Sequence, residues 1–92
     1  MTRFTVTAII DGDTFDVSPA WQWRGQQGTR VRPAGYDAPE LGTEAGARAR
    51  LYLEQLLRGN TVALDSPYRI NRGRLVCEVY LGGRPLSDYV PR

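Results

Sequence analysis

One stretch of this chain has the spacing of a helix, and it separates three strand-like segments from two more. From Thr43 onward, alanines, leucines and a tyrosine recur every three or four residues, as in one amphipathic helix. Thr43 suits the N-cap and Gly59 the position after the C-terminus. We predict a helix over about residues 43–58. Three Glu–Arg pairs stand one turn apart on its solvent side: Glu44–Arg48, Arg50–Glu54 and Glu54–Arg58.

Alternation of apolar and polar residues predicts strands on both sides of this helix. The predicted strands cover residues 5–10, 14–17, 29–36, 61–64 and 75–81. We expect a long hairpin connection over 20–27, a loop over 65–73 and a short tail from 84 with a helical turn at about 86–90. In this arrangement Cys77 alternates with apolar neighbours and is expected in the core.

The order of three strands, a helix and two strands predicts a mainly β (α+β) fold, a small five-stranded barrel of the OB type. Other α+β arrangements have the same order, but a closed barrel leaves no strand edges unpaired. With 92 residues, the chain has room for a single domain spanning 1–92.

The chain has no apolar run that could span a membrane and no basic-then-apolar leader, so we expect a soluble protein without a membrane partner. We also expect a monomer. Its one cysteine cannot form an internal disulfide. The net charge is +2, and every basic residue is arginine. This composition suits bidentate phosphate contacts, although biased codon usage would explain it as well.

Charged residues are concentrated in the run Val-Arg-Pro-Ala-Gly-Tyr-Asp-Ala-Pro-Glu at 31–40. Arg32 lies in an otherwise apolar strand, where a charge needs a partner. Asp37 and Glu40 have simpler explanations, as a turn cap and a solvated loop residue. A regular strand would place Arg32 and Asp37 on opposite faces. We expect a bend between them, because Pro33 and Gly35 favour one.

Two more carboxylates lie at Asp11 and Asp13, and two arginines at Arg72 and Arg74. Asp11-Gly12 alone indicates a tight hairpin. Asp13, however, can project to the same side as Asp11, and neither residue favours a strand.

Carboxylates drawn into one pocket repel unless one is protonated or a cation is held between them. A hard divalent ion with oxygen ligands fits, either calcium or the geometrically stricter magnesium. Histidine is absent from the chain, and Cys77 is alone. This composition argues against an ordinary zinc site and excludes Ser-His and Cys-His catalysis, so a catalytic base would be a carboxylate.

Five motifs in this order resemble the staphylococcal nuclease (thermonuclease) family, from about Val6 to Val90. They are Asp11-Gly12-Asp13-Thr14, Val31-Arg32, Asp37-Ala38-Pro39-Glu40, Gly42-Thr43-Glu44-Ala45 and Gly73-Arg74. The resemblance implies a calcium-dependent nuclease acting on DNA and RNA, preferably single-stranded, with little sequence preference and 3′-phosphate products. Members of the family are often secreted.

The resemblance also implies the role of each matched residue. Asp13, Asp37 and the backbone carbonyl of Ala38 would bind one calcium ion, with Asp11 behind them. Glu40 matches the residue proposed as the general base that activates a water. Arg32 and Arg74 match the two arginines that hold the phosphate. Phosphodiester hydrolysis builds negative charge on the phosphate oxygens, which guanidinium groups and a cation stabilise.

The chain also departs from the family pattern. Ile70, Asn71 and Arg72 replace an acidic residue and a tyrosine before Gly73-Arg74, although Arg72 could itself contact a phosphate. The loop after Glu40 is shorter than in the staphylococcal enzyme. The family's C-terminal helical extension is lacking, so we expect weaker substrate binding, slower turnover, or a chain that is itself truncated.

Trp21 and Trp23 lie in a hairpin segment that is a feature of this chain and not of the family pattern. They could stack on single-stranded bases or pack across the strands, and we favour packing because alternate residues share a strand face. An alternative for the whole chain is a weak or inactive nuclease-like module that binds nucleic acid or a protein without cleaving it.

Overall fold

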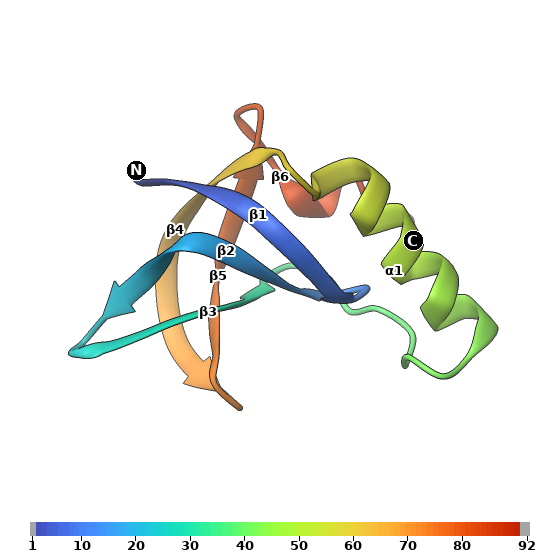
Figure 1. Cartoon of the computed structure of the whole chain (residues 1–92), viewed down its shortest axis with the longest axis horizontal. Coiled ribbons are helices and arrows are strands. Elements are labelled where there is room, and N and C mark those ends of the chain that lie inside the picture. Colours follow the sequence, from blue (N-terminus) through green and yellow to red (C-terminus); the bar gives the residue numbers. More distant parts are fainter. Residues whose placement is uncertain (1, 91–92) are drawn as a thin grey trace.

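Six strands and one helix make up the described part of the chain, which is residues 2–90 of the computed structural model. The elements are β1 (Thr2–Asp11), β2 (Thr14–Trp23), β3 (Gln26–Pro33), α1 (Glu44–Leu57), β4 (Thr61–Asn71), β5 (Arg74–Leu81), β6 (Arg84–Pro85) and the 3-10 turn η1 (Leu86–Asp88). Figure 1 shows α1 beside the strands, joined to β3 by a connection on the outside of the molecule.

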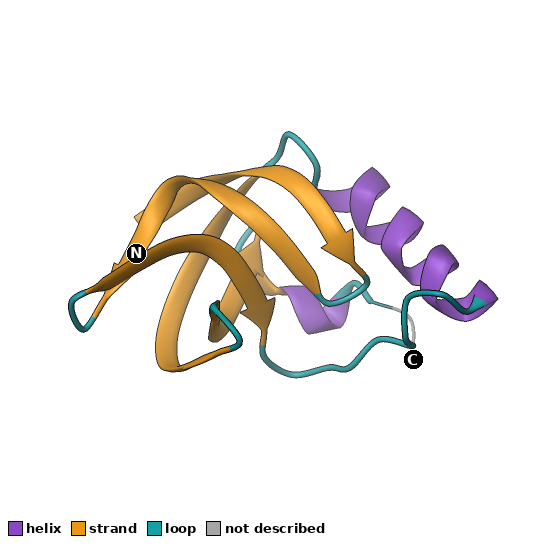
Figure 2. Cartoon of the chain, turned by 60° about the horizontal axis from the view of Figure 1, so that its bottom comes forward, coloured by secondary structure: helices purple, strands orange, loops and turns teal. Residues whose placement is uncertain are grey.

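The sheet closes on itself. Its strand order is β3-β2-β1-β4-β5-β6, and a parallel pairing of β3 with β5 joins the two sides. The five long strands therefore form a closed barrel with one helix between β3 and β4, as predicted. The two-residue strand β6 adds only a short pairing to β5. In Figure 2 the strands curve around a common interior and α1 lies outside them.

The interior is apolar because alternate strand residues point inward. Leu75, Cys77 and Val79 do so on β5 and are buried, which confirms the expectation for Cys77. Burial, with Glu78 nearby, raises the pKa of Cys77 to about 12, so its thiol is neutral at physiological pH. The helix contributes Leu53 to the same core.

The helix has the predicted boundaries to within one residue at each end. The N–H of Gly46 donates to the Thr43 hydroxyl at 3.0 Å, and Gly59 follows the C-cap with φ +80°. All three predicted Glu–Arg pairs form on its exposed side. With 14 residues, α1 is too short to cross a membrane, and no other helix of residues 2–90 is longer.

Several strand boundaries differ from the prediction. β2 continues past Ser18-Pro19, where a stop was predicted. Proline has no N–H to donate, but Pro19 lies between Asp16 and Trp21, where the pairing with β3 is irregular, so no ladder hydrogen bond is broken. β3 ends at Pro33 and not at residue 36, since Gly35 turns the chain at φ +98°. The predicted loop over 65–73 is wrong: β4 runs to Asn71, with a bulge that accommodates Ser66-Pro67.

Candidate functional site

The first part of the site is the hairpin between β1 and β2, which turns at Gly12 and Asp13. The Asp13 N–H donates to Asp11 Oδ1 at 3.0 Å, which fixes the turn. A Cβ added to Gly12 would lie 2.7 Å from the Cβ atoms of both Ala38 and Ala49. The absence of a side chain at Gly12 therefore lets the acidic turn pack directly against the segment after β3 and against α1.

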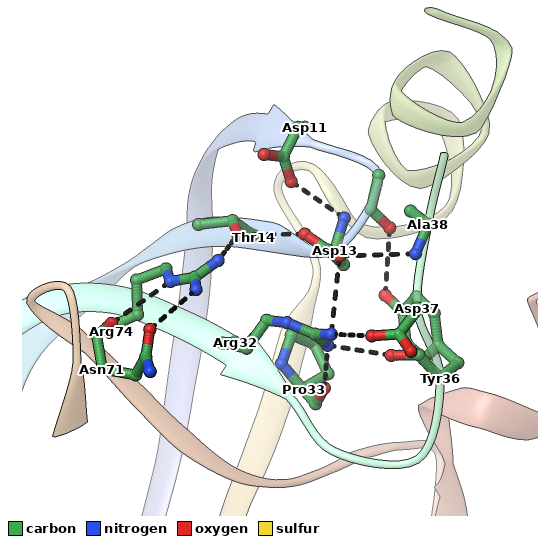
Figure 3. Close-up of polar contacts among 11 residues, drawn as sticks. Asp11, Asp13, Thr14, Arg32, Pro33, Tyr36, Asp37, Ala38, Asn71 and Arg74 are labelled. Carbon is green, nitrogen blue, oxygen red and sulfur yellow. Dashed lines mark hydrogen bonds and ion pairs between the residues drawn. The ribbon is translucent and has the colours of Figure 1, made fainter. Parts of the chain in front are cut away.

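The second part is the bend after β3. The Arg32 side chain folds back along it, and its Nη1 donates to the carbonyls of Pro33 at 2.7 Å and Tyr36 at 2.8 Å. Its Nη2 contacts Asp37 Oδ1 (Figure 3). The bend thus brings Arg32 and Asp37 together despite their opposite strand parity, which confirms the expectation from Pro33 and Gly35.

Asp13 links these two parts. Its Oδ2 lies 3.6 Å from Arg32 Nη2 and accepts the Ala38 N–H at 3.3 Å. The side chains of Asp13 and Arg32 are each 17% exposed, whereas that of Asp37 is 92% exposed. Burial, reinforced by Asp11, raises the pKa of Asp13 even though Arg32 acts in the opposite direction.

The second arginine, Arg74, approaches from the β4–β5 hairpin. Its Nε donates to the Asn71 carbonyl at 3.3 Å and its Nη2 to Asn71 Oδ1 at 3.2 Å. Its Nη1 donates to Thr14 Oγ1 at 3.2 Å, and the Thr14 hydroxyl in turn donates to Asp13 Oδ1 at 3.3 Å. Thr14 is only 2% exposed and connects Arg74 to the acidic turn (Figure 3).

Two carboxylates meet at this point. The carboxylates of Asp13 and Asp37 both face a single nitrogen, Arg32 Nη2, so a positive charge is already placed between them. Within residues 2–90, no three acidic or cysteine side chains are grouped to hold a metal. A ligand set here would consist of two carboxylates and the backbone at Ala38, which fits the flexible oxygen coordination of calcium better than the strict octahedron of magnesium.

Glu40 lies apart from these contacts. Its side chain is exposed, and within residues 2–90 its carboxylate makes no hydrogen bond or ion pair. Its backbone is held at the start of α1, where its carbonyl accepts the Thr43 N–H at 3.3 Å and the Thr43 hydroxyl at 2.7 Å. A Cβ on Gly46 would lie 1.9 Å from this carbonyl oxygen. The structure therefore fixes the Glu40 backbone and leaves its side chain free.

A cavity of about 470 Å³ opens beside the bend. Its charged and aromatic lining comes from Arg32, Tyr36, Asp37, Tyr68, Arg69, Arg72 and Arg74. Arg72 reaches it from the turn between β4 and β5, where Arg72 (φ +54°) and Gly73 (φ +76°) both have the positive φ of a type I′ hairpin. The candidate phosphate-binding arginines thus share one polar cavity.

The two tryptophans lie in the β2–β3 hairpin, outside this cavity. Trp21 is 3% exposed, and its indole N–H donates to the Arg30 carbonyl at 2.7 Å. Packing is confirmed for Trp21, which is not accessible for stacking on a base. Trp23 packs partly against the core, and Arg24 lies over its ring at 4.7 Å.

Sequence analysis gave no positioning role to several residues of the site, two of which join its parts. The Tyr36 hydroxyl donates to the Gly12 carbonyl at 3.2 Å and so joins the bend to the acidic turn. Burial, with Asp13 nearby, raises the pKa of Tyr36. The other residue is Thr14, whose contact with Arg74 spans 60 positions. A polar residue at the start of a buried strand was the only signal in the sequence.

A micrococcal nuclease from Shigella flexneri is 38% identical to this chain over 78 residues. These residues are 85% of the chain and 42% of that nuclease, so the chain spans less than half of its relative. No protein-family model matches. The identity and the closed barrel are consistent with a domain like staphylococcal nuclease.

Proposed function

We propose that this chain is a calcium-dependent endonuclease that hydrolyses phosphodiester bonds of DNA and RNA, preferably single-stranded, with little sequence preference. The observation that carries the proposal is the convergence of Arg32, Asp13 and Asp37 on one point beside Arg74. An anionic substrate and a cation can be held together there. The similarity to a micrococcal nuclease supports the same activity.

In this proposal Asp13, Asp37 and the Ala38 carbonyl would hold the calcium ion. A bound ion would supply positive charge at a phosphate oxygen and lower the pKa of water. Arg32 would donate to the phosphate from a guanidinium oriented by the Pro33 and Tyr36 carbonyls, which accept from its Nη1. Arg32 is therefore oriented before substrate arrives, which reduces the cost of ordering it.

Arg74 holds the other side of the phosphate, in an orientation set by Asn71 and Thr14. Glu40 accepts a proton from the attacking water as the water oxygen forms its bond to phosphorus. The bond from phosphorus to the 5′ oxygen breaks, that oxygen takes a proton from solvent, and a 3′-phosphate remains. The exposed Glu40 side chain can reach solvent, which supplies the water.

The test is cleavage of labelled single-stranded DNA in calcium, in magnesium and in EGTA. We expect cleavage in calcium and none in EGTA. Arg32→Ala should lower the rate about a hundredfold or more, and Glu40→Gln by at least about the same factor. Circular dichroism should show that each variant is folded.

Two variants serve as matched controls. Arg30→Ala removes an arginine two positions earlier on β3, where it pairs with Asp16 at 3.4 Å and lies outside the cavity. Glu44→Gln removes a nearby exposed carboxylate. Both should keep nearly full activity. A folded wild type with no more activity than the Arg32 and Glu40 variants would refute catalysis, and retained binding of the DNA would then favour the non-cleaving module.

A further inference from the structure

An exposed aromatic side chain lies at the proposed phosphate site. Tyr68, on β4, is 57% exposed and lines the same cavity as Arg32 and Arg74. Large aromatic side chains are usually buried for the apolar area they contribute, so an exposed ring that lines a polar cavity needs an explanation.

The β4 bulge explains how Tyr68 reaches this position. Between Asp65 and Arg69, β4 advances four residues while its partner β5 advances two, from Glu78 to Val76. Ser66, inside the bulge, has φ +50°. A bulge re-aims side chains, and in a regular strand Tyr68 would share the inward face of Ile70. The irregularity instead brings it out to the cavity.

Arg69, the next residue, lines the same cavity. Arg32 is paired with Val76 across β3–β5, and Val76 with Arg69 across β5–β4. Residues paired directly across a sheet point to the same face, so Arg32 and Arg69 project to one side with Val76 between them.

The charge at this side is strongly positive. The cavity lining contains four arginines, Asp37 is its only carboxylate, and Arg32 already contacts Asp37. Within residues 2–90, Arg69, Arg72 and Arg74 make no ion pair with a carboxylate. A flexible anion that contacts several arginines in turn fits this lining better than a single small ion.

We propose that Tyr68 and Arg69 form a nucleotide subsite for single-stranded nucleic acid, next to the phosphate held by Arg32 and Arg74. The Tyr68 ring stacks on an unpaired base, and Arg69 contacts the phosphate attached to it. Stacking on a ring accepts any base and requires an unpaired strand. The inference rests on the proposed function and gives its preference for single strands a structural cause.

The test measures binding of two labelled strands of equal length in EGTA, where cleavage is not expected. One is oligothymidylate and the other is the same sugar-phosphate chain without bases. Tyr68→Ala should weaken binding of oligothymidylate about five- to hundredfold and leave binding of the abasic strand unchanged. Tyr68→Phe, which keeps the ring, should bind like the wild type.

Arg69→Ala should weaken binding of both strands and reduce the slope of log affinity against log salt by about one. Arg30→Ala should leave both unchanged. If Tyr68→Ala is unfolded by circular dichroism, Tyr68→Leu replaces it with the same expectation, since leucine fills space without a ring.

Equal losses on the two strands, or no loss on oligothymidylate, would overturn the subsite. Failure of the proposed function is a separate result. A wild type that cleaves DNA while Tyr68→Ala binds normally keeps the nuclease and loses the subsite. A wild type that does not cleave DNA, yet binds oligothymidylate through Tyr68, keeps the subsite and loses catalysis.

Discussion

The arginines of α1 and those of the cavity are the same residue type in opposite settings. On the helix, Arg48, Arg50 and Arg58 each pair with a glutamate one turn away, on the exposed side. In the cavity, Arg32 and Arg74 come from different strands and are oriented by the backbone of a bend, by Thr14 and by Asn71.

The difference shows which charges matter for function. An exposed pair within one helix contributes little and can be lost at small cost. An arginine that is half-buried and fixed by several acceptors is costly to order, and its truncation leaves those acceptors without their donor. The comparison therefore predicts large effects at the cavity and small ones on the helix.

The largest difference is expected between Arg74→Ala and Arg50→Ala. Under the proposed function, loss of Arg74 should lower the cleavage rate about a hundredfold or more, because a donor to the developing charge disappears. Arg50→Ala should change the rate less than about twofold. Initial rates on single-stranded DNA in calcium, with folding checked by circular dichroism, measure both.

Arg74→Lys refines this prediction. Lysine keeps the charge but not the planar fork that contacts both Thr14 and Asn71. We expect it to recover only a small part of the lost rate. Full recovery by lysine would mean that charge alone matters and that the orientation of the guanidinium does not.

The contrast between the helix and the cavity also explains which parts of the fold the sequence predicts. The helix follows from contacts between residues three or four apart, so its cap, its ends and its ion pairs were all predictable. The bend after β3 was predictable too, because Pro33 and Gly35 signal it locally. The second half of β4 was missed, since Ser66-Pro67 reads as a loop until β5 is present to pair on both sides of the bulge.

Among the candidate site residues, sequence analysis singled out most of the charged ones, although not Arg69, and gave no role to those that position them. Charges stand out because few structural purposes need them. Thr14 and Tyr36 are ordinary strand residues in the sequence, and their roles depend on partners 60 and 24 positions away. Such contacts exist only once the barrel is closed.

Gly46→Ala tests the junction between the two regions. In most helices this change stabilises by about 1 kcal/mol. Here the added Cβ would meet the Glu40 carbonyl oxygen at 1.9 Å, so we expect a loss of about 1–3 kcal/mol in the free energy of unfolding in urea. Ala47→Gly, in the same turn, is the control and should show the ordinary helix penalty of about 1 kcal/mol. A more stable Gly46→Ala would mean that the Glu40 backbone is not fixed by this contact.

Tyr36→Phe tests the connection between the bend and the acidic turn. Removing the hydroxyl leaves the Gly12 carbonyl without this donor and should cost about 1 kcal/mol at pH 7. Tyr68→Phe removes an exposed hydroxyl and should cost less than about 0.5 kcal/mol. Urea unfolding of the three proteins measures both costs.

The cost of Tyr36→Phe should also depend on pH. Burial raises the pKa of Tyr36 in the folded state, so above about pH 10 the unfolded chain loses this proton first. The stability that depends on the neutral phenol is fully present below about pH 10 and is lost as the pH rises further. Phenylalanine has no such titration, so the difference between the variant and the wild type should shrink above pH 10. A constant difference would mean that the phenol is not buried as described.

The smallest effect is expected for Glu54→Gln, which removes one carboxylate shared by Arg50 and Arg58 on α1. The two pairs, at 3.3 and 2.7 Å, are partly exposed and should together contribute about 0.5 kcal/mol at low salt. That contribution should vanish in 1 M salt, where charges are screened within about 3 Å. Thermal unfolding of the wild type and the variant at low and at high salt measures the contribution under each condition. A salt-independent loss above about 2 kcal/mol would place the helix pairs in the same class as the cavity arginines and remove the contrast between the two regions.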